Sequence, residues 1–308
     1  MKSEIFYFPG WTRKAVSFTI DDGNVPLDRK FLNIVRPAGI YGTFNLTSVN
    51  ARWGLSPEGY RELYRGYEIA NHVSCHPFAM SEPNLGTRAV ADEPFPGADK
   101  ADKEKMYKTD TEGVYLVAFS TYWSHIATRE AYVELAKRSQ RELEEVFGEG
   151  NIVGFVWPYH LPHDLSYLDE IMKLGYLYIR RTGYTDFSLP ETRERWSYGA
   201  HHANLLERAA EFEAIEDDGE LRFFCFGVHS HDFENNNCWD VLETFADKYG
   251  NRPEDFWYAT VREVFEYEDA LRAATVTESG VINNSEKVIY MKHNGKRVTL
   301  HPHCEYKF

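Results

Sequence analysis

One stretch predicts the fold, Ala15-Val16-Ser17-Phe18-Thr19-Ile20-Asp21-Asp22-Gly23. Its apolar, partly β-branched first half predicts a buried strand, and the glycine with the asparagine after it predicts the turn that ends the strand. Two adjacent carboxylates at the end of a buried strand repel each other and lose hydration, so a cation or a proton transfer is expected to use Asp21 and Asp22. An Asp-Asp-Gly sequence alone is more often an ordinary turn.

A second stretch, Asn71-His72-Val73-Ser74-Cys75-His76, supplies the groups that such carboxylates need. Two histidines four residues apart share one side of a helical turn or tight loop. With one carboxylate they provide the three protein ligands of an open metal site. The histidine spacing arises by chance in many chains, so the prediction depends on its combination with the carboxylate pair.

At these residues the chain resembles the polysaccharide deacetylase family, the carbohydrate esterases named for the NodB homology domain. The first motif of that family ends in Asp-Asp-Gly after an apolar strand, and its second motif is Asn-His-(Ser/Thr)-x-x-His. Val73 stands where the second motif has a hydroxyl residue. The resemblance implies that Asp21 is the catalytic base. It also implies three ligands for a divalent metal: Asp22, His72 and His76.

The third motif of the family resembles Phe-Arg-x-Pro-Tyr-Gly, in which the Tyr backbone amide helps to hold an oxyanion and the Arg pairs with the base. In this chain Pro158 and Tyr159 match, Val156 stands in place of the Arg, and His160 replaces the Gly. The resemblance therefore implies an oxyanion role for Tyr159. Trp157 and Pro158 are predicted to contact the substrate.

A different arginine is expected to orient the base, because Val156 has no group that can do so. Arg180 and Arg181 follow the next predicted strand, 176–179, at the same rim. Strand alternation lets only one of them face inward, and Arg181, nearer the strand exit, is the predicted partner of Asp21. Arg180 is then expected to be a surface charge.

The last motif follows the most apolar strand of the chain, 221–228. The sequence His229-Ser230-His231-Asp232-Phe233 resembles a family motif whose histidine is the general acid, which implies that role for His229. His231 is predicted to be a neighbour without a role. His201 and His202 are predicted to begin a helix and are candidate substrate contacts.

Strands and helices alternate along the rest of the chain, which is typical of an α/β barrel or an open parallel sheet. Three predicted helices follow a hydroxyl residue that can cap them: Ser56, Thr128 and Thr260. The resemblance covers about residues 12–272 and implies a deformed (β/α) barrel of about seven strands. Residues 1–274 are the predicted catalytic barrel, and 275–308 a small β-rich appendage in which Asn294-Gly295 predicts a hairpin. Residues 78–112 are rich in Pro and Gly without apolar periodicity, which predicts a substrate-side loop or a disordered insertion.

The composition is that of a globular protein with a sizeable core: 308 residues, 43% hydrophobic and 15% aromatic. A net charge of −14 provides no basic surface for nucleic acid or an anionic membrane, so neither is an expected partner. Residues 1–9 resemble neither a signal peptide nor an anchor, and the four cysteines show no paired spacing, so a cytoplasmic location is expected. A homo-oligomer remains open.

The resemblance implies a metal-dependent hydrolase that removes an N-acetyl or O-acetyl group from a carbohydrate. Zinc is expected from the ligand types, and cobalt or nickel suits the same ligands. Two alternatives stay open. Some relatives hydrolyse small amides or cyclic imides, often without the metal histidines. A catalytically silent glycan-binding protein would also fit the lost motif arginine and the 20 Tyr, 20 Phe and 7 Trp available for sugar stacking.

Overall fold

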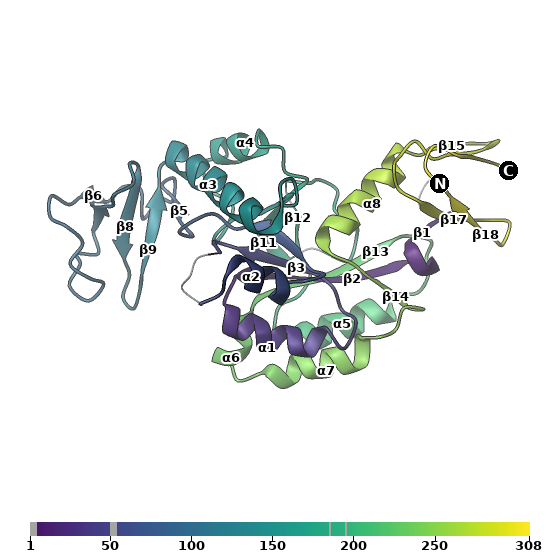
Figure 1. The fold of residues 1–308 in the computed structure, drawn as a ribbon, viewed down its shortest axis with the longest axis horizontal. Coiled ribbons are helices and arrows are strands. Elements are labelled where there is room, and N and C mark those ends of the chain that lie inside the picture. The colour runs from purple at the N-terminus through teal and green to yellow at the C-terminus, as the bar shows by residue number, and fades with distance from the viewer. Residues whose placement is uncertain (1–4, 50–53, 185, 195) are drawn as a thin grey trace.

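A computed structural model describes residues 5–49, 54–184, 186–194 and 196–308. At its centre lies a parallel sheet that is rolled into a barrel (Figure 1). In spatial order its strands are β12 (Trp196–Tyr198), β11 (Tyr178–Tyr184), β10 (Gly154–Val156), β4 (Glu68–Asn71), β3 (Thr43–Leu46), β2 (Lys14–Asp22) and β13 (Arg222–His229). A parallel bridge between Ala200 and Phe226 nearly closes the ring. The predicted seven-stranded barrel is confirmed; an eighth strand, β14 (Phe256–Tyr258), pairs with the start of β2.

Strand β2 shows how the sequence builds this barrel. Val16, Phe18 and Ile20 belong to the largest apolar core, which lies between the barrel and its helices. Thr19 and Asp21 point to the opposite side, because successive side chains of a strand alternate. There Asn45 of β3 donates hydrogen bonds of 2.7 Å to both of them. The part of the barrel interior near the carboxyl end of β2 is therefore polar and hydrogen-bonded.

Helices cover the outside of the barrel (Figure 1). They are α1 (Val25–Val35), α2 (Pro57–Leu63), α3 (Arg129–Phe147), α4 (Ser166–Met172), α5 (Leu205–Ala214), α6 (Ser230–Asn235), α7 (Trp239–Tyr249) and α8 (Val261–Ala273), with a short 3₁₀ turn η1 (Pro9–Trp11) before β2. Ser56, Thr128 and Thr260 cap α2, α3 and α8 as predicted. Within the described ranges, no helix has both the length and the apolarity needed to cross a membrane.

The stretch predicted as a loop or a disordered insertion is neither. It contributes three short strands to a separate five-stranded sheet: β5 (Phe78–Ala79), β6 (Ala89–Val90) and β7 (Lys105–Lys108). The other two strands, β8 (Val114–Ala118) and β9 (Trp123–Ala127), follow this stretch. We call residues 78–127 the inserted sheet; Figure 1 shows it at one end of the long axis of the molecule. Its core joins Leu85 and Met106 to Val117 and Ile126. Because these partners are distant in sequence, apolar periodicity within 78–112 did not reveal them.

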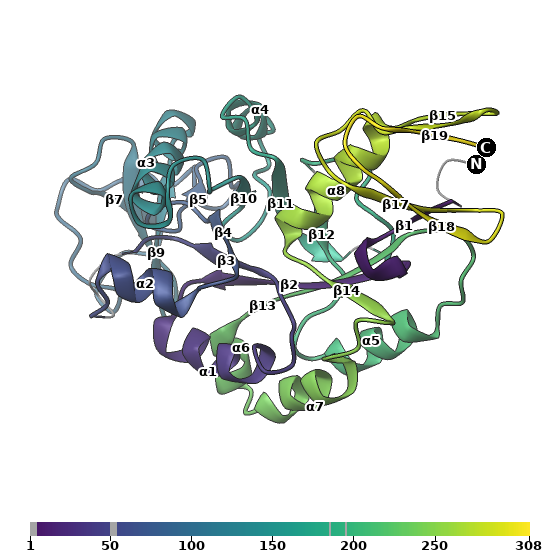
Figure 2. The same cartoon turned by 45° about the vertical axis from the view of Figure 1, so that its right-hand side comes forward.

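The C-terminal residues form two small antiparallel sheets beside α8 (Figure 2). One contains β15 (Thr275–Thr277), β16 (Gly280–Ile282) and β19 (Glu305–Lys307); the other contains β17 (Ile289–His293), β18 (Lys296–Leu300) and the N-terminal β1 (Phe6–Tyr7). The hairpin predicted at Asn294-Gly295 is confirmed, with both φ angles positive. Phe6 and Met291 share a core with Phe265 of α8. The boundary at residue 274 stays a prediction.

Candidate active site

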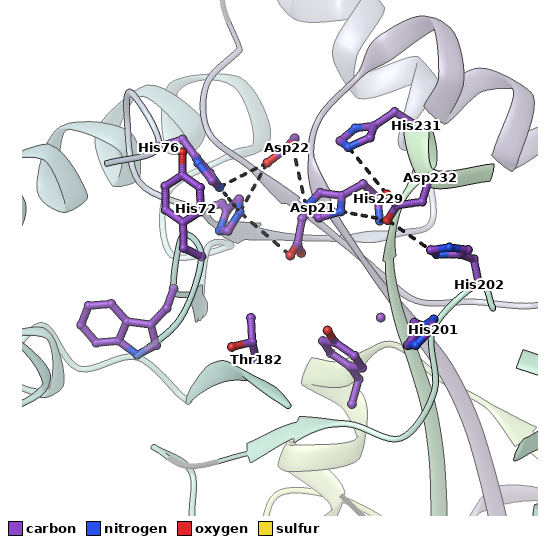
Figure 3. A pocket seen from close by; sticks show the side chains of 14 residues that line it. Asp21, Asp22, His72, His76, Thr182, His201, His202, His229, His231 and Asp232 are labelled. Atoms are coloured by element: carbon purple, nitrogen blue, oxygen red, sulfur yellow. Dashed lines mark hydrogen bonds and ion pairs between the residues drawn. The ribbon is translucent and has the colours of Figure 1, made fainter. Parts of the chain in front are cut away.

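A cavity of about 610 Å³ opens where the barrel strands end. Asp21 and Asp22 end β2, His72 follows β4, and His229 ends β13, so parallel strands deliver all four side chains to one place (Figure 3). Trp157 and Tyr159 also line the cavity. The structure thus brings together most of the site residues predicted from the sequence.

Asp22, His72 and His76 present three ligand atoms to one point. Asp22 Oδ1 lies 3.6 Å from His72 Nε2 and 3.5 Å from His76 Nε2, and the two nitrogens are 3.2 Å apart. Two bonds of about 2.0–2.1 Å from a tetrahedral ion require ligand atoms to be about 3.3 Å apart. Asp22 Oδ1 is also buried without a hydrogen-bond partner among the described residues. These three residues therefore fit a divalent metal ion.

The surrounding backbone fixes the orientation of the two histidines. His72 Nδ1 lies 2.9 Å from the Val156 carbonyl oxygen, which can only accept, so Nδ1 carries the proton and the lone pair of Nε2 faces Asp22. Val73, Cys75 and His76 all have positive φ angles, and such strain in non-glycine residues is typical of functional sites. Val73 is fully buried in an apolar core, which accounts for its replacement of the hydroxyl residue.

Arg180, and not Arg181, holds Asp21. The Arg180 guanidinium donates to Asp21 Oδ1, and its side chain is 1% exposed, whereas Arg181 is exposed to solvent. The prediction for Arg181 is wrong because β11 continues to Tyr184, so Arg181 is not at the strand exit, and the inward side of this strand belongs to Arg180. Arg180 lies directly beside Val156 in the β10–β11 register. The guanidinium that β10 lacks at Val156 is therefore supplied by Arg180 at the neighbouring position of β11.

The charges around Asp21 keep it ionised. Burial alone would raise the pKa of Asp21, but Arg180, His72 and His229 outweigh burial and hold the pKa below its usual value. Asn45 adds a hydrogen bond of 2.7 Å to the same oxygen that Arg180 contacts. One carboxylate oxygen is thus fixed by two donors while the other faces the His72 side of the cavity, 4.0 Å from Nε2.

His229 is paired with a carboxylate that the sequence analysis did not assign to the site. Its Nδ1 lies 3.0 Å from Asp232 Oδ2, and its Nε2 lies 3.9 Å from Asp22 Oδ2. Burial alone would lower the pKa of His229, but Asp232, Asp21 and Asp22 raise it to about 9. Asp232 lies only three residues after His229, so this spacing in the sequence was enough to indicate the pair. His231 stacks on His229 and lines the cavity too.

Tyr159 is fixed by the inserted sheet. Its ring stacks on Phe78 with centroids 3.4 Å apart, and its hydroxyl lies 2.6 Å from Ser124 Oγ. Burial raises the pKa of Tyr159 to about 12, so the hydroxyl stays neutral. Phe78 and Ser124 were not predicted as site residues, because Tyr159, which they contact, is distant from both in the chain. Pro158 is buried and is not among the residues that line the cavity, so the predicted substrate contact there is not supported.

The far wall of the cavity carries polar and aromatic groups from β11, β12 and the segment after β12. Thr182, Tyr198, His201 and His202 lie there. The predicted helix start at the histidines is wrong, because α5 begins at Leu205. Both histidines nevertheless face the cavity, and their contact with a substrate stays a prediction.

Comparisons with solved structures return carbohydrate deacetylases. The polysaccharide deacetylase Bc1974 from Bacillus cereus is 11% identical and covers 80% of this chain and 91% of its own, with a TM-score of 0.44. The chitin deacetylase of the fungal pathogen Colletotrichum lindemuthianum is 15% identical (84% and 89% covered, TM-score 0.45). The Xyl-CE4 domain of a multidomain xylanase from the hindgut metagenome of Trinervitermes trinervoides is 13% identical (83% and 92% covered, TM-score 0.47).

The sequence itself identifies the family. No curated protein matches the chain. The family model described as polysaccharide deacetylase, however, matches residues 10–179, more than half of the 308 residues, and this range contains Asp21, Asp22, His72, His76 and Tyr159. The chain belongs to the polysaccharide deacetylase family.

Proposed function

We propose that this protein is a metal-dependent hydrolase that removes an acetyl group from the nitrogen or oxygen of a carbohydrate. One observation carries the proposal: three metal-ligand atoms converge beside an ionised carboxylate that Arg180 and Asn45 hold in place. Membership of the deacetylase family supports the same reaction class.

Asp22, His72 and His76 would hold the metal, and zinc is the expected ion because two imidazoles and one carboxylate suit it. When bound, a divalent ion there supplies Lewis-acid polarisation of the acetyl carbonyl and a lower pKa for water. The hydrogen bond from His72 Nδ1 to the Val156 carbonyl selects the tautomer of the neutral imidazole in which Nε2 is free to coordinate.

Asp21 is the general base in this proposal. Its carboxylate is ionised, and Arg180 and Asn45 occupy one oxygen, so the other is available to accept a proton from the attacking water. Water attacks the acetyl carbon, the bond from that carbon to the sugar nitrogen or oxygen breaks, and acetate leaves.

His229 is the proposed general acid. Asp232 fixes its Nδ1 and keeps the imidazolium stable, so Nε2 can donate a proton to the leaving amine or alcohol. The backbone amide of Tyr159 is the proposed hydrogen-bond donor to the oxyanion, by resemblance to the family. The positive φ of Tyr159 and the fixed ring support a rigid position for that amide.

The two alternatives lose support from particular residues. The silent glycan-binding protein was considered because Val156 replaces the motif arginine, and Arg180 makes the missing contact from the adjacent strand. Hydrolysis of a small amide without metal histidines does not account for His72 and His76, whose nitrogens are 3.2 Å apart and face the same carboxylate oxygen.

Metal content and acetate release together test the proposal. Wild-type protein loaded with zinc is incubated with N-acetylated chitooligosaccharide, peptidoglycan fragments and acetylated xylan, and acetate is measured. We expect acetate release from at least one of them. Asp22→Asn and His76→Ala should each lose one equivalent of zinc and the activity. Asp21→Asn should keep its zinc and lose about 100- to 10,000-fold in rate, because it removes a positioned base.

Two results would contradict the assignment. Wild-type zinc content in His76→Ala would show that the ligand set is wrong. Equal zinc loss in Asp21→Asn and Asp22→Asn would refute the different roles of the two carboxylates. Absence of acetate release from all three substrates by zinc-loaded protein would count against carbohydrate deacetylation itself.

A further inference from the structure

A second group of metal-binding side chains lies outside the catalytic residues. It consists of Glu82, which follows β5, and of His160 and His163, which follow β10. Glu82 Oε2 lies 2.8 Å from His160 Nε2 and 3.4 Å from His163 Nε2, and all three ligand atoms lie within 4.8 Å of one another. One carboxylate oxygen therefore faces two imidazole nitrogens, the same donor set as in the catalytic group.

Glu82 has a largely buried side chain and a backbone held in a tight turn. Only 10% of the Glu82 side chain is exposed, whereas the two histidine side chains are 41% and 61% exposed. The Glu82 carbonyl accepts hydrogen bonds from the backbone amides of Leu85 and Gly86, and its amide donates to Ala79. This tight turn fixes Glu82 before any ligand arrives, and the exposed histidines leave an open path for one.

An ion pair alone does not account for the arrangement. One imidazole is enough to pair with Glu82, but Nε2 of the second imidazole also lies 3.4 Å from the same carboxylate oxygen, and the two rings lie 5.9 Å apart. A divalent ion instead uses the lone pairs of both neutral imidazoles and the carboxylate at once. His303 and Glu286 show the contrast: they form a simple pair of 2.9 Å in which both side chains are well exposed.

The position of the group gives it a structural consequence. Glu82 belongs to the inserted sheet, whereas His160 follows Tyr159 directly and stands where the family motif has a glycine. An ion bound by all three residues would join the inserted sheet to the rim of the catalytic cavity. It would act beside the two contacts that already fix Tyr159, those with Phe78 and Ser124.

We propose that Glu82, His160 and His163 form a second divalent-metal site, of the zinc type, that fastens the inserted sheet to the catalytic rim. Its three protein ligands leave a coordination position for water. The site is independent of the proposed deacetylation, because none of its ligands belongs to the catalytic group.

Zinc stoichiometry tests the proposal. Metal-free protein of residues 1–308 is dialysed against zinc, and bound zinc is measured by plasma mass spectrometry. We expect about two equivalents in the wild type, about one in His163→Ala, about one in His76→Ala and none in the double variant. His163 is 61% exposed, so its substitution should leave the fold intact. His303→Ala is the matched control and should still bind about two equivalents.

Hydrogen exchange provides a readout that locates the second ion. In His76→Ala, zinc at about 100 times its dissociation constant should slow exchange of amides 80–88 by about 100-fold, because opening must release the metal. Adding His163→Ala should abolish this protection. One equivalent of zinc in the wild type with none in His76→Ala would overturn the proposal, as would unchanged stoichiometry in His163→Ala.

Discussion

The two ends of the barrel interior treat a buried carboxylate in opposite ways. At the carboxyl ends of the strands, Asp21 is held by the guanidinium of Arg180, and its pKa is lowered. Near the opposite end, Glu68 receives hydrogen bonds from neutral donors: the Thr43 and Tyr178 hydroxyls and the Arg262 backbone amide. Burial outweighs these donors and raises the pKa of Glu68 to about 7.

The difference shows that burial alone does not set the charge of a side chain in this barrel. Both carboxylates lose hydration, but only Asp21 has a full positive charge in contact with it. The carboxylate at the end with the charged pair therefore stays ionised at neutral pH, whereas the carboxylate at the other end, beneath α8, is partly protonated. Four predictions test this difference and the contacts around the catalytic cavity.

Removing the charged partner should have the largest effect. Arg180→Ala leaves Asp21 without its cation, so we expect at least about a 100-fold loss of turnover from the misplaced base. Breaking a buried pair also costs about 3–5 kcal/mol of folding free energy. Arg180→Lys keeps the charge and should fold while still losing activity, because it lacks the planar fork. Acetate release measures the loss of turnover, and urea unfolding measures the loss of folding free energy.

Arg181→Ala is the control for this comparison. Its side chain is exposed on the other face of β11, so turnover and zinc content should match the wild type. A loss of turnover in Arg181→Ala as large as that in Arg180→Ala would contradict the assignment of Arg180.

Replacing Glu68 by a neutral residue should change the pH dependence of stability. The folded pKa of Glu68, about 7, lies above its ordinary value of 4.5, so the folded state binds the extra proton. The contribution of this proton to the free energy of unfolding is full below about pH 4.5 and is lost as pH rises through 7. We expect Glu68→Gln to remove about 2 kcal/mol of the fall in unfolding free energy between pH 5 and pH 8.

Urea unfolding of both proteins at the two pH values measures this difference. Asp28, whose pKa burial also raises to about 7, is present in both proteins, so its contribution cancels. Parallel pH profiles for wild type and Glu68→Gln would show that Glu68 is ionised in the folded state.

Moving the arginine from β11 to the neighbouring position of β10 should restore part of the turnover that is lost without Arg180. Val156 and Arg180 are neighbours in a parallel pair, and their side chains leave the same face of the sheet. The double variant Val156→Arg, Arg180→Val should therefore recover about 10-fold of the turnover that Arg180→Val loses. The single variant Val156→Arg, which places two guanidinium groups together, should gain nothing. Equal turnover in the double variant and in Arg180→Val would show that β10 cannot present the group.

The smallest effect is expected at the tyrosine hydroxyl. Tyr159→Phe loses its hydrogen bond to Ser124, which should cost about 1 kcal/mol of stability. Turnover should change little, because the proposed oxyanion donor is the backbone amide and the hydroxyl is neutral with a pKa of about 12. Thermal unfolding and acetate release measure the two quantities. A large loss of turnover with unchanged stability would assign the hydroxyl to the reaction.

Features that depend on neighbouring residues were predictable from the sequence. The caps at Ser56, Thr128 and Thr260 and the Asn294-Gly295 hairpin are local interactions, and they appear where expected. The apolar runs in β2 and β13 placed the acidic pair and His229 at strand ends, and parallel strands bring such ends together.

Only the tertiary structure could decide which arginine meets Asp21 and how residues 78–112 fold. Arg180 and Asp21 are 159 residues apart, and the inward face of β11 follows from its register with β10. The inserted sheet buries Leu85 and Met106 against Val117 and Ile126, which both lie beyond residue 112. The sequence alone determines local propensity and the spacing of candidate ligands, whereas register and long-range burial select the partners, because a one-residue shift reverses the face of every side chain in a strand.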